Sequence, residues 1–175
     1  MMLHDVAKVS VDPEDKGVNY DHAELGVPIA QTFLEGIGVP NDLCIRVYKL
    51  IELHMRGAGS DSMGASAVRR LANDLYPATI NDWLRLNEAD KSSKFMTLHI
   101  GMSREAQDVN RLSKSMLIQD DKPQFILMGR HLIELGMKPG PEMGSVLRNA
   151  YEAQLDGVFD SLEGALEWLK GGCNV

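Results

Sequence analysis

Five histidine and aspartate side chains in the first half of the sequence have the types needed for metal chemistry. They are the adjacent pair His4 and Asp5, followed by His22, His54 and Asp90. Imidazole nitrogens and carboxylate oxygens together bind divalent cations. A bound cation makes hydroxide from water near neutral pH and polarises a phosphoryl oxygen. These residues are therefore candidates for a metal-dependent phosphohydrolase site, provided that the fold brings them together.

Each of these residues also has a simpler structural explanation. An inward-facing histidine at a helix end is commonly a hydrogen-bonded core residue, and an aspartate near a helix end commonly caps the helix or is solvated. The argument for chemistry therefore depends on the five side chains as a set and not on any one of them.

The spacing of apolar residues predicts that helices position these side chains. Helices are expected at residues 22–37, 40–54, 65–75, 79–89, 103–118, 129–135, 141–155 and 161–169. His22 opens the first helix, His54 closes the second on its apolar face, and Asp90 shares a face with Trp83 of the fourth. No alternating apolar run is long enough to indicate a sheet, so the sequence predicts an all-α fold.

Two local features of these helices are also predicted. The first helix carries an apolar stripe, expected to be its buried face, that consists of Leu25, Ile29, Ala30, Phe33 and Ile37. The last helix is expected to begin with a capping box formed by Asp160 and Glu163.

Four short segments resemble, in their order along the chain, the motifs of HD-domain phosphohydrolases. The segments are Leu3 to Lys8, Asp21 to Gly26, Leu53 to Met55 and Leu86 to Asp90. The resemblance implies an HD-like helical bundle in which His4, Asp5 and Asp90 bind a metal. It implies that His22 and His54 are catalytic, as phosphate binders or as ligands of a second ion. The family's first histidine ligand lies upstream of the His-Asp pair, where this sequence has no counterpart.

The last third of the chain resembles a second and more specific pattern, that of bacterial CCA-adding enzymes, the tRNA nucleotidyltransferases. The resemblance rests on residues 129–144 and 151–157 and on Ser161 to Glu163. It departs from the family at His131, where an aspartate is usual, and at Met143, where a phenylalanine is usual. It implies that the chain corresponds to the C-terminal HD and tail region of such an enzyme.

The motifs of a nucleotidyltransferase head are missing from this sequence. No Gly-Ser precedes an Asp-x-Asp pair, and neither Arg-Arg-Asp nor Glu-Asp-x-x-Arg occurs. We therefore expect that this chain alone does not add CCA, and that addition would require a separate head.

A polar segment at residues 119–123 divides the chain into two expected units: a truncated HD-type helical domain at 1–118 and a helical tail at 119–175. In the tail, Arg130, His131 and Lys138 are candidate RNA or phosphate ligands near a Pro-Gly-Pro turn into a helix. The alternative is that this motif only packs the last helices together, because acidic residues outnumber basic ones in the tail.

Composition narrows the class of protein. The chain has 175 residues and a formal net charge of −7, so nucleic-acid binding would depend on a local basic patch. Cys44 and Cys173 are the two cysteines, too few for a disulfide scaffold. No apolar run is long enough to cross a membrane, and the N-terminus does not resemble a signal peptide. These features predict a soluble cytoplasmic protein, and apolar surface left by the missing head predicts a possible homodimer.

Three functional hypotheses follow. The first is a divalent-metal phosphohydrolase that uses Ni, Mn, Mg, Fe or Zn to hydrolyse a phosphomonoester or a 2′,3′-cyclic phosphodiester. The second is the non-catalytic tRNA-binding body and tail of a split or truncated CCA-adding enzyme. The third is a fragment that folds without activity.

Overall fold

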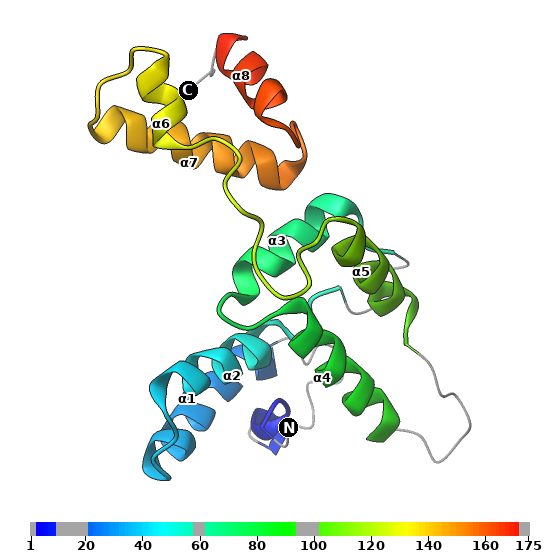
Figure 1. The fold of residues 1–175 in the computed structure, drawn as a ribbon. Helices are drawn as coiled ribbons and strands as arrows, with labels where there is room; N and C mark the ends of the chain where they lie inside the picture. Colours follow the sequence, from blue (N-terminus) through cyan, green and yellow to red (C-terminus); the bar gives the residue numbers. More distant parts are fainter. Residues whose placement is uncertain (1–2, 10–20, 58–61, 94–101, 172–175) are drawn as a thin grey trace.

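The computed structural model describes residues 3–9, 21–57, 62–93 and 102–171, and within these ranges all regular structure is helical (Figure 1). The elements are the 3₁₀ helix η1 (Val6–Val9) and the α-helices α1 (Asp21–Gly36), α2 (Asn41–Leu53), α3 (Ala65–Leu75), α4 (Ile80–Ser93), α5 (Arg104–Ser115), α6 (Gly129–Glu134), α7 (Pro141–Asp156) and α8 (Leu162–Lys170). The predicted all-α fold class is confirmed. Cys173 lies outside the described residues. No described helix has both the length and the apolarity that a membrane crossing needs.

Helix ends follow local chemistry. Helix α3 spans the predicted residues and ends two positions before Pro77, as the steric restriction on pre-proline residues requires. Helix α4 begins with a capping box, in which Asp82 N donates to Thr79 Oγ1 (3.1 Å) and Thr79 N donates to Asp82 Oδ2 (3.2 Å). The capping box predicted for α8 is wrong, because Ser161, and not Asp160, caps that helix by accepting from Gly164 N at 3.2 Å.

The larger core cluster lies among the C-terminal end of α2 and the helices α3, α4 and α5. Its buried members include Leu53, Val68, Leu71, Leu75, Ile80, Trp83 and Val109. Trp83 is 2% exposed, and its indole Nε1 donates to the carbonyl of Leu53 at 2.9 Å. This bond joins α4 to the last turn of α2.

A second core cluster lies in the tail, among α6, α7 and α8. Its buried members are Leu127, Leu132, Met143, Ala150, Phe159 and Ala165. Ile118 belongs to the first cluster and Leu127 to the second. The two clusters are joined by α3 and α7, where Arg70 pairs with Glu152 (3.0 Å) and Asp156 (2.7 Å). The predicted boundary between residues 118 and 119 stays a prediction.

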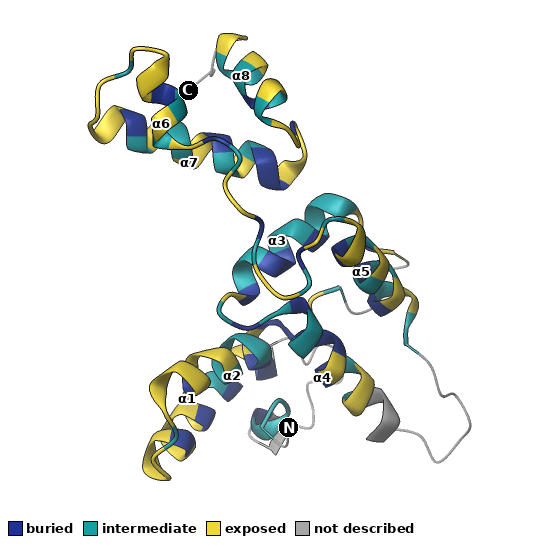
Figure 2. Cartoon of the chain, viewed as in Figure 1, coloured by how far each residue is buried: buried dark blue, intermediate teal, exposed yellow. Residues whose placement is uncertain are grey.

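The predicted buried face of α1 is wrong for its largest residues. Leu25, Ile29, Phe33 and Ile37 are 37–62% exposed, whereas Ala23, Ala30 and Leu34 are buried (Figure 2). Small residues bring α1 close to its neighbours: a Cβ atom added at Gly26 would lie 3.1 Å from Ile51 Cγ2. Close packing against α2 and η1 therefore selects the small-residue face of α1 and leaves the larger apolar stripe on the surface.

Candidate metal centre

The five histidines and aspartates singled out from the sequence come together at one place in the structure. His4 and Asp5 immediately precede η1, His22 lies in the first turn of α1, His54 directly follows α2, and Asp90 lies in the second half of α4. We call these residues the histidine–aspartate cluster. Four segments that are far apart in sequence thus supply one site.

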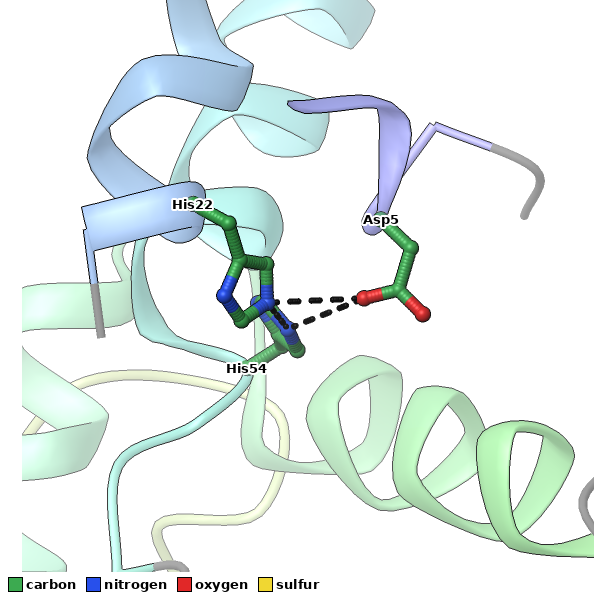
Figure 3. Close-up of side chains that lie close together, drawn as sticks. All are labelled: Asp5, His22 and His54. Atoms are coloured by element: carbon green, nitrogen blue, oxygen red, sulfur yellow. Dashed lines mark hydrogen bonds and ion pairs between the residues drawn. The ribbon is translucent and has the colours of Figure 1, made fainter. Parts of the chain in front are cut away.

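Asp5, His22 and His54 form the more buried part of the cluster (Figure 3). The Asp5 Oδ1 atom lies 3.4 Å from His22 Nε2 and 3.8 Å from His54 Nε2. The two imidazole Nε2 atoms are 3.2 Å apart. Two nitrogens and one oxygen therefore point toward a common position, which is a donor set suited to a divalent cation.

His4, Asp5 and Asp90 form the second and more exposed part. His4 Nε2 lies 3.2 Å from Asp90 Oδ1 and 3.4 Å from Asp5 Oδ2. The two carboxylate oxygens of Asp5 thus face different groups, Oδ1 toward His22 and His54 and Oδ2 toward His4. Residue type and spacing do not predict that one carboxylate, that of Asp5, belongs to both parts of the cluster.

Backbone carbonyls near the end of α2 fix the orientation of His54. Its Nδ1 lies 2.7 Å from the carbonyl oxygen of Ile51. A carbonyl only accepts, so Nδ1 carries the proton, and Nε2 of the neutral ring presents a lone pair to the cluster. The neighbouring Leu53 carbonyl is held by Trp83. Sequence reasoning missed both supports, because a carbonyl carries no signal in residue type.

The electrostatic environment keeps His54 neutral. Burial is the main cause that lowers the pKa of the His54 imidazole, and the nearby His22 and His4 lower it further, against opposing contributions from the Ile51 carbonyl and Asp5. A neutral imidazole is the form that binds a metal. The donor types, the converging atoms and this protonation state all fit a cation site.

The three residues predicted as phosphate ligands in the tail are arranged less favourably. His131 Nδ1 lies 3.1 Å from the Met128 N–H that it accepts, and its Nε2 lies 3.2 Å from Arg130 Nε. A neutral imidazole has one acceptor nitrogen, so only one of these contacts is a hydrogen bond at a time. Lys138 is exposed in the turn between α6 and α7.

The known proteins that this chain resembles are CC-adding and CCA-adding enzymes. The chain is 30% identical to the CC-adding tRNA nucleotidyltransferase of Thermus thermophilus, over an alignment of 174 residues that covers 96% of this chain. The chain is a homologue of CCA-adding enzymes. CCA-adding enzymes of Streptococcus pyogenes serotypes M5 and M2 are 36% identical to it, over 75 and 67 residues, or 40% and 35% of the chain. No family model and no solved structure matches.

The shared region is only part of each relative. The alignments cover 38% of the Thermus thermophilus protein and 17% and 16% of the two Streptococcus pyogenes enzymes. The homology of this chain to CCA-adding enzymes therefore covers nearly all of its own length, and the chain spans about two fifths of the Thermus thermophilus protein.

Proposed function

We propose that this CCA-adding enzyme homologue is a divalent-metal-dependent phosphohydrolase that acts on phosphomonoesters or 2′,3′-cyclic phosphodiesters. The observation that carries the proposal is the convergence of the histidine–aspartate cluster, in which ligand-type atoms of five side chains meet around the Asp5 carboxylate. Simple core packing does not explain why two carboxylates accompany three histidines there.

His4, Asp5 and Asp90 would hold the metal, and Ni, Mn, Mg, Fe and Zn all accept such mixed nitrogen and oxygen ligands. When bound, the metal supplies Lewis-acid polarisation of the phosphoryl group and a lowered pKa for its water. His22 and His54 would bind the phosphate oxygens or hold a second cation. These roles are proposals for the positions that the geometry brings together.

Exposure indicates from which side a substrate would arrive. The side chains of His22 and His54 are 1% and 5% exposed, whereas those of His4, Asp90 and Asp5 are 16%, 20% and 28% exposed. A phosphate would therefore enter past His4 and Asp90 and meet His22 and His54 at the buried end of the cluster. In that position, His22 would contact a phosphate oxygen. The Nε2 lone pair of His54, which the Ile51 carbonyl orients, would hold the His22 ring, whose Nε2 lies 3.2 Å away.

Metal analysis and a hydrolysis assay test this proposal together. We expect the purified protein to bind Ni²⁺ or Mn²⁺ and, when loaded, to hydrolyse bis(4-nitrophenyl) phosphate or 2′,3′-cyclic AMP. His4→Ala should lower both binding and turnover by at least about 100-fold. The matched control Asp108→Asn changes a half-buried aspartate of α5 that lies outside the cluster, and it should leave both unchanged. Absence of metal and of turnover, with no change on His4→Ala, would refute the proposal.

A second candidate function is favoured by the relatives' names, which describe enzymes that act on tRNA. In this alternative, the chain is a tRNA-binding body and tail, with Arg130, His131 and Lys138 contacting RNA phosphates and a separate head supplying nucleotidyl transfer. A gel shift with tRNA at two salt concentrations tests it, because phosphate contacts weaken as salt rises. No shift at low salt would remove this candidate.

We also propose a homodimer, supported by the exposed apolar stripe of α1. Leu25, Ile29 and Phe33 lie four residues apart and therefore line one side of the helix. Sedimentation equilibrium should show self-association of the wild type and its loss in Phe33→Asp. A monomer at all concentrations would exclude the dimer.

A further inference from the structure

A groove of about 780 Å³ lies in the tail. Figure 1 shows α6 and α7 on a different part of the molecule from η1, α1, α2 and α4, which carry or adjoin the histidine–aspartate cluster. One wall is the segment 124–129, which leads into α6. The other wall is the part of α7 from Gly144 to Glu152. We call this site the aromatic groove. None of the residues that line the aromatic groove takes part in the functions proposed above. Arg130, a candidate RNA ligand, directly follows the segment 124–129.

Two stacked aromatic rings form the most distinctive surface of the aromatic groove. The centroids of Phe125 and Tyr151 are 4.1 Å apart, with ring planes inclined by 33°. The Tyr151 hydroxyl lies 2.9 Å from the carbonyl of Pro123 and 3.1 Å from Asn73 Oδ1, and it donates its single proton to one of these acceptors at a time. Phe125 rests on this anchored ring and is still 45% exposed. The stack therefore presents aromatic surface to solvent in a fixed orientation.

A buried glutamine holds the backbone on both sides of Phe125. Gln154 is 6% exposed, its Oε1 accepts from Ile126 N at 3.1 Å, and its Nε2 donates to the Gln124 carbonyl at 2.7 Å. Gln154 and Tyr151 therefore anchor a segment whose central side chain, Phe125, is exposed. Such preorganisation lowers the entropy lost when a ligand binds.

Arg148 supplies the positive charge in the lining of the groove, which also contains Glu152. Glu152 is neutralised by Arg70 across the junction with α3, at 3.0 Å. Arg148, in contrast, contacts only the Ser145 hydroxyl, at 3.0 Å, and no acidic side chain in the described part of the chain pairs with it. The groove thus combines a guanidinium free for a ligand with an exposed aromatic face.

We propose that the aromatic groove binds a nucleotide, with the base stacked on Phe125 and the phosphate on Arg148. Every nucleobase has a face that stacks on an aromatic side chain, and arginine forms paired hydrogen bonds with phosphate oxygens. The side-chain amide of Asn149 and the amide oxygen of Gln124, both in the lining, can hydrogen-bond to base edges, whereas Gln124 Nε2 already donates to Asp121 at 2.9 Å. This site does not depend on hydrolysis at the histidine–aspartate cluster.

Nuclear magnetic resonance of the ¹⁵N-labelled full chain tests the site with adenosine 5′-monophosphate as the probe. We expect saturable shifts of backbone amides at residues 124–129 and 144–152. Adenosine, which lacks the phosphate, and ribose 5-phosphate, which lacks the base, should each bind more weakly. The proposal is overturned if the nucleotide causes no shift at millimolar concentration, or shifts only residues outside the two walls.

Variants separate the two contacts. Phe125→Ala should weaken nucleotide binding by about tenfold or more, and Phe125→Tyr should restore it. Arg148→Gln should abolish the advantage of the nucleotide over adenosine. Leu135→Ala and Arg104→Gln, which change an exposed apolar residue and an exposed arginine outside the groove, are matched controls. Unchanged binding in both groove variants would contradict the proposal, and thermal melting would verify that all variants are folded.

A short oligoadenylate distinguishes the source of the nucleotide. If the oligonucleotide binds more tightly than the mononucleotide and shifts the same amides, the ligand is a single-stranded RNA. Equal affinity indicates a free nucleotide, and either result supports the site. Oligonucleotide binding that survives Phe125→Ala without change would instead count against it.

Discussion

The histidine–aspartate cluster and the aromatic groove are built in opposite ways. The cluster takes five side chains from four segments, and each depends on the packing of α1, α2, α4 and η1. The groove takes its residues from 29 consecutive positions, 124 to 152, and is held by Gln154 and Tyr151 within the tail. The cluster therefore depends on the packing of helices far apart in the sequence. The groove depends mainly on contacts within the tail, with added contacts from Asn73 and Arg70 of α3.

The largest expected effect separates the two halves of the cluster. Asp5→Ala removes the carboxylate that faces both groups, so we expect it to abolish metal binding at each. Asp90→Ala removes a ligand from one group only and should leave any ion held by His22 and His54. Metal content by mass spectrometry, with calorimetric titration, measures the difference. Equal losses in both variants would show that the cluster holds a single ion.

Buried hydrogen bonds supply the next largest effect and test whether the two sites are independent. Trp83→Phe removes the indole donor from the Leu53 carbonyl beside His54 and leaves that carbonyl with the Arg56 N–H alone. Gln154→Leu strands Ile126 N and the Gln124 carbonyl. Each should lower the free energy of unfolding by about 1–3 kcal/mol. Urea denaturation measures this loss. Trp83→Phe should weaken metal binding alone and Gln154→Leu nucleotide binding alone, and a crossed effect would mean that the sites are coupled.

The junction between α3 and α7 should contribute less. Arg70→Ala removes the pairs with Glu152 and Asp156, which are 60% and 54% exposed, so solvent screening keeps the loss of stability small. It also frees Glu152 at the edge of the aromatic groove. We therefore expect a small loss of stability together with weaker nucleotide binding, measured by denaturation and titration. Arg70→Lys should retain most of both.

The smallest expected effect is a pH dependence of the contact between α2 and α4, the helices that end near His54 and Asp90. Burial pushes the pKa of Asp82 upward, but hydrogen bonds from Arg46 (2.8 Å) and Thr79 outweigh it, so the pKa lies below its ordinary value. A lowered carboxyl pKa stabilises the fold above the unfolded-state pKa, and this stabilisation is lost as pH falls through the folded-state pKa.

Denaturation of the wild type and of Asp82→Asn measures this contribution. The wild type should be more stable by about 1 kcal/mol or less at neutral pH, because Arg46 is largely exposed, and the difference should shrink below about pH 4. A difference that grows in acid would contradict the assignment.

Residue type and spacing predicted the helices and the members of the cluster well, for a physical reason. Proline, capping residues and apolar periodicity act locally, so the bounds of α3 were predicted from its own residues. Asp90 was predicted from its helical spacing to Trp83, and in the structure Trp83 is buried and Asp90 is half-buried beside His4.

The failures arise where tertiary packing decides. Periodicity gave α1 an apolar stripe, but close approach to Ile51 favoured the face with Gly26 and Ala30. The aromatic groove had no local signal, because Phe125 and Tyr151 are far apart in the sequence and meet through tertiary packing, in which Gln154 holds the backbone beside Phe125. The contacts of Asp5 Oδ1 with His22 and His54, and of Oδ2 with His4, likewise depend on the tertiary structure.

The position of Asp5 has a consequence for the thermodynamics of folding. The segment that carries it touches the rest of the molecule through α1 and through the cluster. An ion that binds only the folded chain adds to its stability by mass action, in proportion to the logarithm of the ion concentration over its dissociation constant. Asp5 would then link the segment before η1, through the ion, to residues of α1 and α4 and to His54 after α2. Chelators would act as mild denaturants.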